Sequence, residues 1–117
     1  MAHTGIFATS NEIKFKAGAG VSAAASTEAN INQLAKEVEA FCNNLTRTNY
    51  SDTFSGLNVD QTGLLTEIET NYCGYFLIAY DNSGYNSIRE AENLMNTCWA
   101  RFIQCIGLFK HKQWLIV

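Results

Sequence analysis

The chain has 117 residues, of which 47% are hydrophobic, and it carries a formal net charge of −3 at pH 7. This length predicts one domain, and the hydrophobic content is enough for a core, which excludes a wholly disordered protein. The acidic balance excludes a protein whose main task is to grip nucleic acid by its phosphates.

The first 26 residues predict an arm, a short helix and a connector. Residues 1–9 show no helical pattern and are expected to form an extended N-terminal arm. A short helix is predicted at 11–16 with Ser10 as its N-cap, because a serine oxygen accepts from the free amides of a first helical turn. The small residues of AGAGVSAAAS (17–26) then indicate a connector, whose first glycines can end the helix.

A long amphipathic helix is predicted at 27–46, capped by Ser26 or Thr27. Its apolar residues recur at spacings of three and four, as in one buried stripe. They are Ile31, Leu34, Ala35, Val38, Phe41, Cys42 and Leu45. The polar stretch 47–58 that follows is predicted to be a loop that can include a turn of helix. Three side chains are expected to pin this loop to the core: Tyr50, Phe54 and Leu57.

A third helix is predicted from Asn58 to Asp81. Asn58 and Gln61 have the spacing of a capping box, in which each side chain accepts from the backbone amide of the other residue. The second half of this helix is apolar on nearly all sides, which predicts burial on several faces. A buried strand at 75–80 is the alternative, since that stretch is rich in aromatic residues. The helical period that begins upstream favours the helix.

The polar segment YDNSGYNSIREAE (80–92) separates two apolar runs and predicts the turn of a helical hairpin. Gly84 is expected to take a left-handed conformation in this elbow. Ser87 and Glu90 form a second capping-box pattern, which begins a helix predicted at 88–110. The apolar stripe of that helix is expected to lie in the core. It consists of Ala91, Leu94, Met95, Cys98, Trp99, Phe102, Ile106 and Phe109.

No arrangement of residues in the sequence is typical of a catalytic or metal site. The four cysteines form no CxxC pair and are expected to be small buried side chains. They are Cys42, Cys73, Cys98 and Cys105. The two histidines, His3 and His111, are expected in the arm and at a solvated helix end. Acidic pairs such as Glu37 and Glu39 are two residues apart, so on a helix they face different ways. We therefore expect no enzyme, no cofactor and no metal ion.

The C-terminal tail, residues 111–117, follows the last predicted helix. It contains four apolar residues in succession, Trp114, Leu115, Ile116 and Val117. Such a segment can pack on its own domain, or it can dock on another subunit by strand addition or by filling a groove. The second alternative is favoured, and Ile6 and Phe7 of the arm are expected to make similar partner contacts. We find no targeting segment and no apolar run long enough to cross a bilayer, which predicts a protein made in a cytosol without a membrane partner.

Several stretches of the chain follow a familiar order. EIKFKAGA (12–19) combines a short helix with a glycine stop, and EVE (37–39) and TRTNY (46–50) close the next helix. The most distinctive stretch is YDNSGYNSIREAE (80–92), followed by Met95. In these features the sequence resembles the small helical head–tail connector proteins, or head-completion adaptors, of tailed bacteriophages. The likeness extends over most of the chain.

The resemblance implies a non-enzymatic virion protein of the phage neck, made in the host cytoplasm. It implies a homo-oligomeric ring, a dodecamer, beneath the portal protein and joined to tail or tail-completion proteins. Double-stranded DNA would pass through the ring without sequence-specific binding, and the net negative charge suits a conduit that repels DNA. A small helical binding protein for an apolar ligand or a partner helix is the alternative, suggested by the aromatic residues at 72–80.

Overall fold

The structure, a computed structural model, describes residues 2–111, and every regular element in that range is a helix. The elements are α1 (Ser10–Ala17), α2 (Glu28–Thr46), α3 (Tyr50–Thr53), the 3-10 turn η1 (Phe54–Gly56), α4 (Val59–Tyr80) and α5 (Ile88–His111). The predicted all-α fold is confirmed. Three long helices, α2, α4 and α5, form a small bundle, and α1 is the short N-terminal helix.

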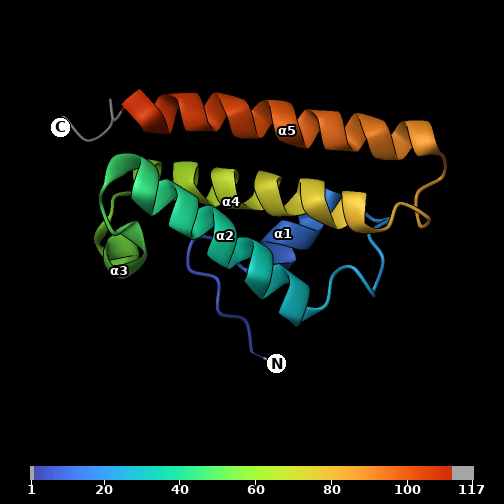
Figure 1. The fold of residues 1–117 in the computed structure, drawn as a ribbon, viewed down its shortest axis with the longest axis horizontal. Coiled ribbons are helices and arrows are strands. Elements are labelled where there is room, and N and C mark those ends of the chain that lie inside the picture. The colour runs from blue at the N-terminus through green and yellow to red at the C-terminus, as the bar shows by residue number, and fades with distance from the viewer. Residues whose placement is uncertain (1, 112–117) are drawn as a thin grey trace.

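The central helix of the bundle is α4. In Figure 1, α5 runs antiparallel along one side of α4, while α1 and α2 lie on its other sides. The short elements α3 and η1 occupy the connection between α2 and α4. Because α4 packs against three other helices, it buries residues in several directions. This position explains why its sequence is apolar on nearly all sides.

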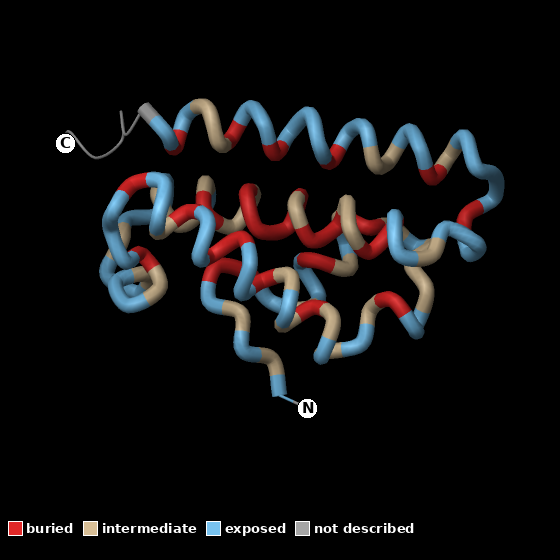
Figure 2. Tube along the Cα trace, viewed as in Figure 1, coloured by how far each residue is buried: buried red, intermediate tan, exposed pale blue. Residues whose placement is uncertain are grey.

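The core consists of two clusters along α4. Figure 2 colours the buried residues red, and many of them lie along α4. One cluster joins Ile13 of α1, Ile31 of α2 and Ile78 of α4. The other contains Phe7, Val38, Cys42, Tyr50, Leu65, Ile68, Phe102, Cys105 and Phe109. The two clusters together tie every long helix to α4, so the bundle presents a fixed set of surfaces to its surroundings.

The N-termini of α1 and α4 are capped by hydrogen bonds of the predicted kind, but the capping residue of α1 differs from the prediction. Thr9, rather than Ser10, caps α1: its Oγ1 accepts from the Glu12 amide at 3.2 Å, and the Glu12 carboxylate accepts from the Thr9 amide at 2.8 Å. This reciprocal pair is a complete capping box, and it moves the helix start one residue earlier than predicted. The predicted capping box of Asn58 and Gln61 begins α4, as expected.

Two stretches that the sequence left open are ordered as helix and as a folded loop. Residues 75–80 are helical, because α4 continues without interruption to Tyr80. The stretch 47–58 contains α3 and η1. Tyr50 is 2% exposed, and its ring lies edge-on to that of Phe109 with centroids 5.4 Å apart. The loop is therefore anchored on α5, at the end of the bundle remote from the elbow.

The elbow between α4 and α5 is tied to the end of α1. Asp81 Oδ1 accepts hydrogen bonds from the amide and the hydroxyl of Ser83, at 3.0 and 2.7 Å. This Asx-type turn reverses the chain just after α4. Tyr85 is 7% exposed, and its hydroxyl donates to the carbonyl oxygen of Ala17 at 2.5 Å. The elbow is thus fixed to the rest of the bundle by a buried tyrosine.

The prediction that Gly84 is left-handed is wrong, since the described glycine with a positive φ is Gly18, at 88°. Gly84 is needed for a different reason. A Cβ at this position would collide with the carbonyl oxygen of Gly20, because the two backbones are in direct contact. The elbow therefore packs backbone against backbone on the connector that follows α1. Beyond it α5 begins as predicted, with Ser87 Oγ accepting from the Glu90 amide at 3.1 Å.

Candidate protein-interaction surface

The N-terminal arm lies on the helices. The Glu39 carboxylate of α2 accepts from the amides of Ile6 at 2.7 Å and Phe7 at 3.4 Å, and the Thr66 hydroxyl of α4 donates to the Phe7 carbonyl at 2.6 Å. Phe7 is 1% exposed and stacks on Phe54 with ring centroids 5.4 Å apart, whereas Ile6 is 43% exposed. Phe7 is therefore a core residue in this fold and not the partner contact predicted from the sequence. Ile6 stays at the surface.

A serine, a histidine and a glutamate meet where the arm joins α1, but they are not arranged as a nucleophilic triad. The Ser10 hydroxyl lies 2.7 Å from both oxygens of the Glu28 carboxylate and donates to it directly. His3 Nδ1 lies 2.9 Å from that hydroxyl oxygen, and His3 Nε2 donates to the Ala8 carbonyl at 2.7 Å. In a triad the histidine stands between hydroxyl and carboxylate. The cluster instead holds the arm against α2, and the bond from Ser10 lowers the pKa of Glu28.

One carboxyl group of α4 is fully buried. Glu69 is 0% exposed, and neither of its oxygens has a hydrogen-bond partner among the described residues. Burial, together with the neighbouring Glu39 carboxylate, raises the pKa of Glu69 to about 10. The group is therefore uncharged at neutral pH. Because solvent does not reach it, a substrate does not reach it either, and we assign it to the core.

The four cysteines are buried free thiols, as the sequence predicts. Burial, with smaller contributions from Glu69 and Glu39, raises the pKa of Cys42 to about 12, so this residue stays a thiol at neutral pH. Among the side chains of residues 2–110, no three His, Cys, Asp or Glu are grouped so as to hold a metal ion. The described helices also include none with the length and apolarity of a membrane span.

Five aromatic rings form a closed circuit between α4 and α5. Successive centroids are 4.8 Å apart for Tyr72 and Phe76, 5.0 Å for Phe76 and Tyr75, 4.9 Å for Tyr75 and Trp99, 5.2 Å for Trp99 and Phe102, and 5.5 Å for Phe102 and Tyr72. Each ring thus meets two others, at separations typical of favourable aromatic pairs. We call this set the aromatic circuit.

The aromatic circuit is only partly covered by the rest of the chain. Trp99 is 40% exposed, so the prediction that it lies in the core is wrong. It sits at the margin of the apolar stripe, where its indole covers Tyr75 instead of entering the space between the helices. Ile103, one turn further along α5, is 52% exposed. Neighbouring exposed apolar side chains of this kind make the surface a candidate site of interaction.

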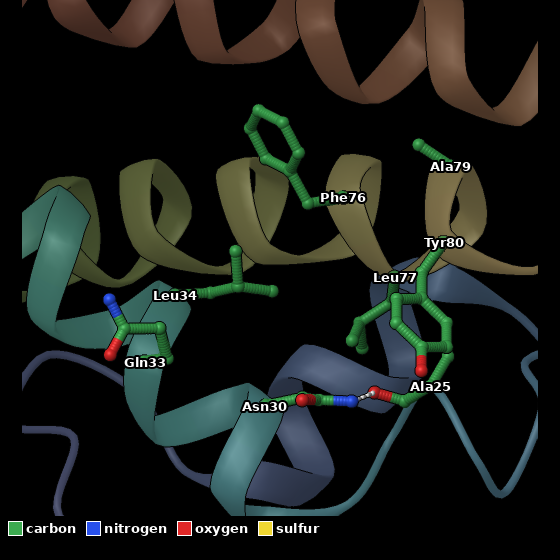
Figure 3. A pocket seen from close by; sticks show the side chains of 8 residues that line it. All are labelled: Ala25, Asn30, Gln33, Leu34, Phe76, Leu77, Ala79 and Tyr80. Atoms are coloured by element: carbon green, nitrogen blue, oxygen red, sulfur yellow. Dashed lines mark hydrogen bonds between the residues drawn. The ribbon is translucent and has the colours of Figure 1, made fainter.

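An apolar groove adjoins the aromatic circuit at Phe76. Figure 3 shows its walls: Leu34 comes from α2 and Phe76 from α4, and the Asn30 side chain donates to the Ala25 carbonyl at 3.1 Å. The groove has a volume of about 360 Å³. It is lined by Ala25, Asn30, Gln33, Leu34, Phe76, Leu77, Ala79 and Tyr80. We call it the α2–α4 groove. Its volume lies at the lower end of the range of ligand sites, about 300–1,000 Å³.

The groove and the aromatic circuit belong to one apolar surface across three helices. Phe76 is shared by the two. Phe41, seven residues after Leu34 and so on the same face of α2, is 47% exposed. We refer to the aromatic circuit, the α2–α4 groove and their exposed neighbours Phe41 and Ile103 as the interaction surface. Most of the residues that form it are apolar or aromatic, and the groove adds the amide side chains of Asn30 and Gln33.

The sequence located this surface only in part. Of the six residues that the sequence predicts to contact a partner, four lie outside the described residues: Trp114, Leu115, Ile116 and Val117. The stretch 72–80, suggested as a pocket lining, does contribute residues to the groove. The pairing of that stretch with Trp99 and Phe102 was missed. One signal in the sequence could have indicated this pairing. Tyr72 and Tyr75 are three residues apart, and so are Trp99 and Phe102.

The chain was compared with protein-family models, with curated proteins and with solved structures, and none of the three comparisons gives a match.

Proposed function

We propose that this chain is a non-enzymatic structural adaptor of a tailed-phage virion, one subunit of a ring that joins the portal to the tail around the DNA channel. The observation that carries the proposal is the aromatic circuit. Its five rings contact one another, yet Trp99 and the adjacent Ile103 leave apolar surface in solvent. Exposed aromatic anchors of this kind are typical of protein–protein contacts.

The resemblance supplies the kind of partner. The stretch most similar to connector proteins, residues 80–92, forms the elbow that sets the angle between α4 and α5. Tyr85 locks this elbow to the end of α1. The two helices that carry the aromatic circuit are therefore fixed relative to each other, as a ring subunit requires. Rigid surfaces lose little conformational entropy on association, which favours assembly.

A binding experiment with the portal complex encoded by the same genome tests the proposal. Purified chain, mixed with isolated portal rings, is expected to co-sediment with them at a fixed stoichiometry. The Trp99→Ala variant is expected to bind more weakly, because it removes the centre of the exposed aromatic area. Val59→Ala is the matched control, since Val59 is 85% exposed at the start of α4 and outside the interaction surface. A wild-type chain that does not co-sediment, with or without tail proteins present, contradicts the proposal.

A second candidate function is a small helical binding protein that takes an apolar ligand or a partner helix. The α2–α4 groove favours it, because its volume of about 360 Å³ and its apolar walls suit a small molecule. Native mass spectrometry of the purified chain separates the two functions. A small molecule bound in a one-to-one ratio, and lost in an Ala79→Arg variant that obstructs the groove, supports the ligand-binding function.

A further inference from the structure

We propose that the α2–α4 groove receives the apolar residues Trp114–Val117 of a second copy of this chain. The inference rests on the proposed function, since it states how neighbouring subunits of the ring would engage each other. The groove is an apolar cavity with no described segment of its own chain in it, and the tail is the most apolar segment outside the described residues. Each is therefore a candidate partner for the other.

The tail of the same molecule is too short to fill the groove with its apolar residues. The rings of Trp99 and Tyr75 are in contact, so they mark the same level of the bundle. From Trp99, α5 runs on to His111, about 18 Å further away, and Ala79 lies about 6 Å from Tyr75 in the opposite direction. Six extended residues span at most about 22 Å, which is less than this separation of about 24 Å, so that at most the last residue of the tail could approach the near end of the groove at Phe76.

The reach of the individual side chains makes the exclusion stronger. Trp114 is three residues beyond His111, so it extends at most about 11 Å from the end of α5. To place Trp114 and the residues after it in the groove, the tail would have to start beside the groove. The tail of the same molecule starts instead at the C-terminal end of α5. Occupation of the groove by Trp114–Val117 therefore requires a second molecule, whose α5 can approach from outside the bundle.

The charges around the groove complement those beside the tail. Glu37 lies at one margin, where it accepts from the amide nitrogen of the groove residue Gln33 at 3.0 Å. Asp81 follows the groove residue Tyr80 at the other margin. The apolar residues Trp114–Val117 are preceded by Lys110 and Lys112. An incoming tail would thus bring positive charge to a groove flanked by negative charge, which favours encounter and orientation of the two copies.

Polar groups at the rim also suit an extended segment. The amide nitrogens of Asn30 and Gln33 are already used, by the Ala25 carbonyl and by Glu37. Their amide oxygens can accept hydrogen bonds from the backbone of a docked chain. Since the groove and the tail are different parts of the molecule, the contact is heterologous. Each copy inserts its tail into the groove of one neighbour and receives the tail of another neighbour in its own groove. Such contacts close into rings when the rotation between copies allows it.

The test uses two full-length point variants with complementary defects. Leu115→Asp introduces a charge into the apolar tail and leaves the groove intact, while Ala79→Arg obstructs the groove and leaves the tail intact. Ala79 is exposed on α4, so the arginine is tolerated by the fold, and Ala100→Arg, on an exposed alanine of α5 outside the groove, is the matched control. Circular dichroism and thermal unfolding verify that each variant is folded.

The binding measurement is fluorescence anisotropy with a labelled peptide of residues 109–117, titrated against the Leu115→Asp chain. Saturable binding with a Kd between about 10 μM and 1 mM is expected. Adding Ala79→Arg to the Leu115→Asp chain is expected to weaken it at least about tenfold, equivalent to 1.4 kcal/mol, and adding Ala100→Arg is expected to leave it unchanged. No binding at about 1 mM, or binding insensitive to Ala79→Arg, overturns the inference. Binding of an apolar dye to the groove without binding of the peptide overturns it too, and assigns the groove to a small molecule.

A mixing experiment gives an independent readout. Sedimentation velocity of the Leu115→Asp and Ala79→Arg variants together is expected to show a one-to-one complex that neither forms alone, because one functional tail meets one functional groove. Mixtures that stay monomeric contradict the inference. These outcomes are separate from portal binding: a chain that co-sediments with the portal but binds no peptide keeps the proposed function and loses the tail–groove contact.

Discussion

The indole of Trp99 lies against the phenol ring of Tyr75, with centroids 4.9 Å apart, while 40% of the Trp99 surface is in solvent. One residue thus completes the aromatic circuit and presents its outer face to solvent. A core tryptophan would contribute to stability alone, and a freely exposed one would contribute to neither stability nor orientation. The intermediate position of Trp99 makes it the residue whose removal best separates folding from assembly.

Trp99→Ala is expected to reduce portal binding more than it reduces stability. The variant loses two aromatic contacts and part of its burial, for which we expect a decrease of about 1–3 kcal/mol in the free energy of unfolding. A tryptophan at the centre of an interface costs about 2 kcal/mol or more in binding when truncated. Urea denaturation and quantitative co-sedimentation measure the two effects. A variant that binds as well as wild type would remove the aromatic circuit from the interface.

Neighbouring residues of the arm are expected to differ sharply in their contribution to stability. Phe7 is 1% exposed and Ile6 is 43% exposed. Phe7→Ala leaves a cavity beside Phe54 and is expected to lower the free energy of unfolding by about 3–5 kcal/mol, whereas Ile6→Ala is expected to cost about 1 kcal/mol or less. Denaturant titration of both variants measures this difference. Equal, small effects would mean that the arm is not packed on the helices.

The burial of Phe7 is an example of a feature that could not be predicted from the sequence alone. Helical periodicity identified α2, α4 and α5, because apolar spacing and capping residues are local properties of the chain. The arm has no periodicity, so the sequence offered no reason to place Phe7 in the core. Its burial depends on Glu39, which accepts from the Ile6 and Phe7 amides across 33 and 32 residues of the chain, respectively. Contacts of this kind are set by tertiary packing, which no local pattern reports.

The two misplaced residues of the hairpin have a similar explanation. Gly84 lies in a turn, where a left-handed conformation is the usual reason for glycine. The actual reason, contact with the backbone of Gly20, depends on how the elbow packs against a distant connector. Trp99 fits the apolar stripe of α5, but it lies at the edge of that stripe. Exposure at an edge depends on whether α2 or α4 extends over it, which the sequence of α5 does not contain.

Stability is expected to fall as pH rises because of Glu69. The ordinary pKa of a glutamate is 4.5, while burial beside Glu39 raises that of Glu69 to about 10. Between these values the folded chain keeps a proton that the unfolded chain releases, so the free energy of unfolding decreases with increasing pH. Glu69→Gln, which has no proton to lose, is expected to remove this dependence. The stability of the variant relative to wild type is therefore expected to increase from acidic to alkaline pH.

The measurement is urea denaturation of wild type and Glu69→Gln at about pH 5 and about pH 9, within the window where the two states differ in bound protons. Glu92→Gln, at an exposed position on α5, is the control for removing one carboxyl group from the surface. It is expected to leave the pH dependence of wild type unchanged. Parallel pH profiles for wild type and Glu69→Gln would show that Glu69 is ionised in the folded chain.

Two glycines are expected to respond to alanine with opposite signs. At Gly84 an added Cβ meets the carbonyl oxygen of Gly20, so Gly84→Ala must separate the elbow from the connector and destabilise the fold. At Gly63, inside α4, an added Cβ has nothing within 4 Å, and Gly63→Ala is expected to stabilise by about 0.5–1 kcal/mol through helix propensity. Thermal unfolding of both variants measures the difference. A Gly84→Ala chain as stable as wild type would contradict the backbone contact.

The most direct test of the proposed adaptor function is cryo-electron microscopy of particles produced by the genome that encodes this chain. The map is expected to contain a ring between portal and tail, into which the α2–α4–α5 bundle fits with the interaction surface turned toward a neighbouring protein. Mass spectrometry of the same particles is expected to detect the chain in a fixed ratio to the portal protein. A neck in which portal and tail proteins account for all density, in particles that lack the chain, would contradict the proposed function.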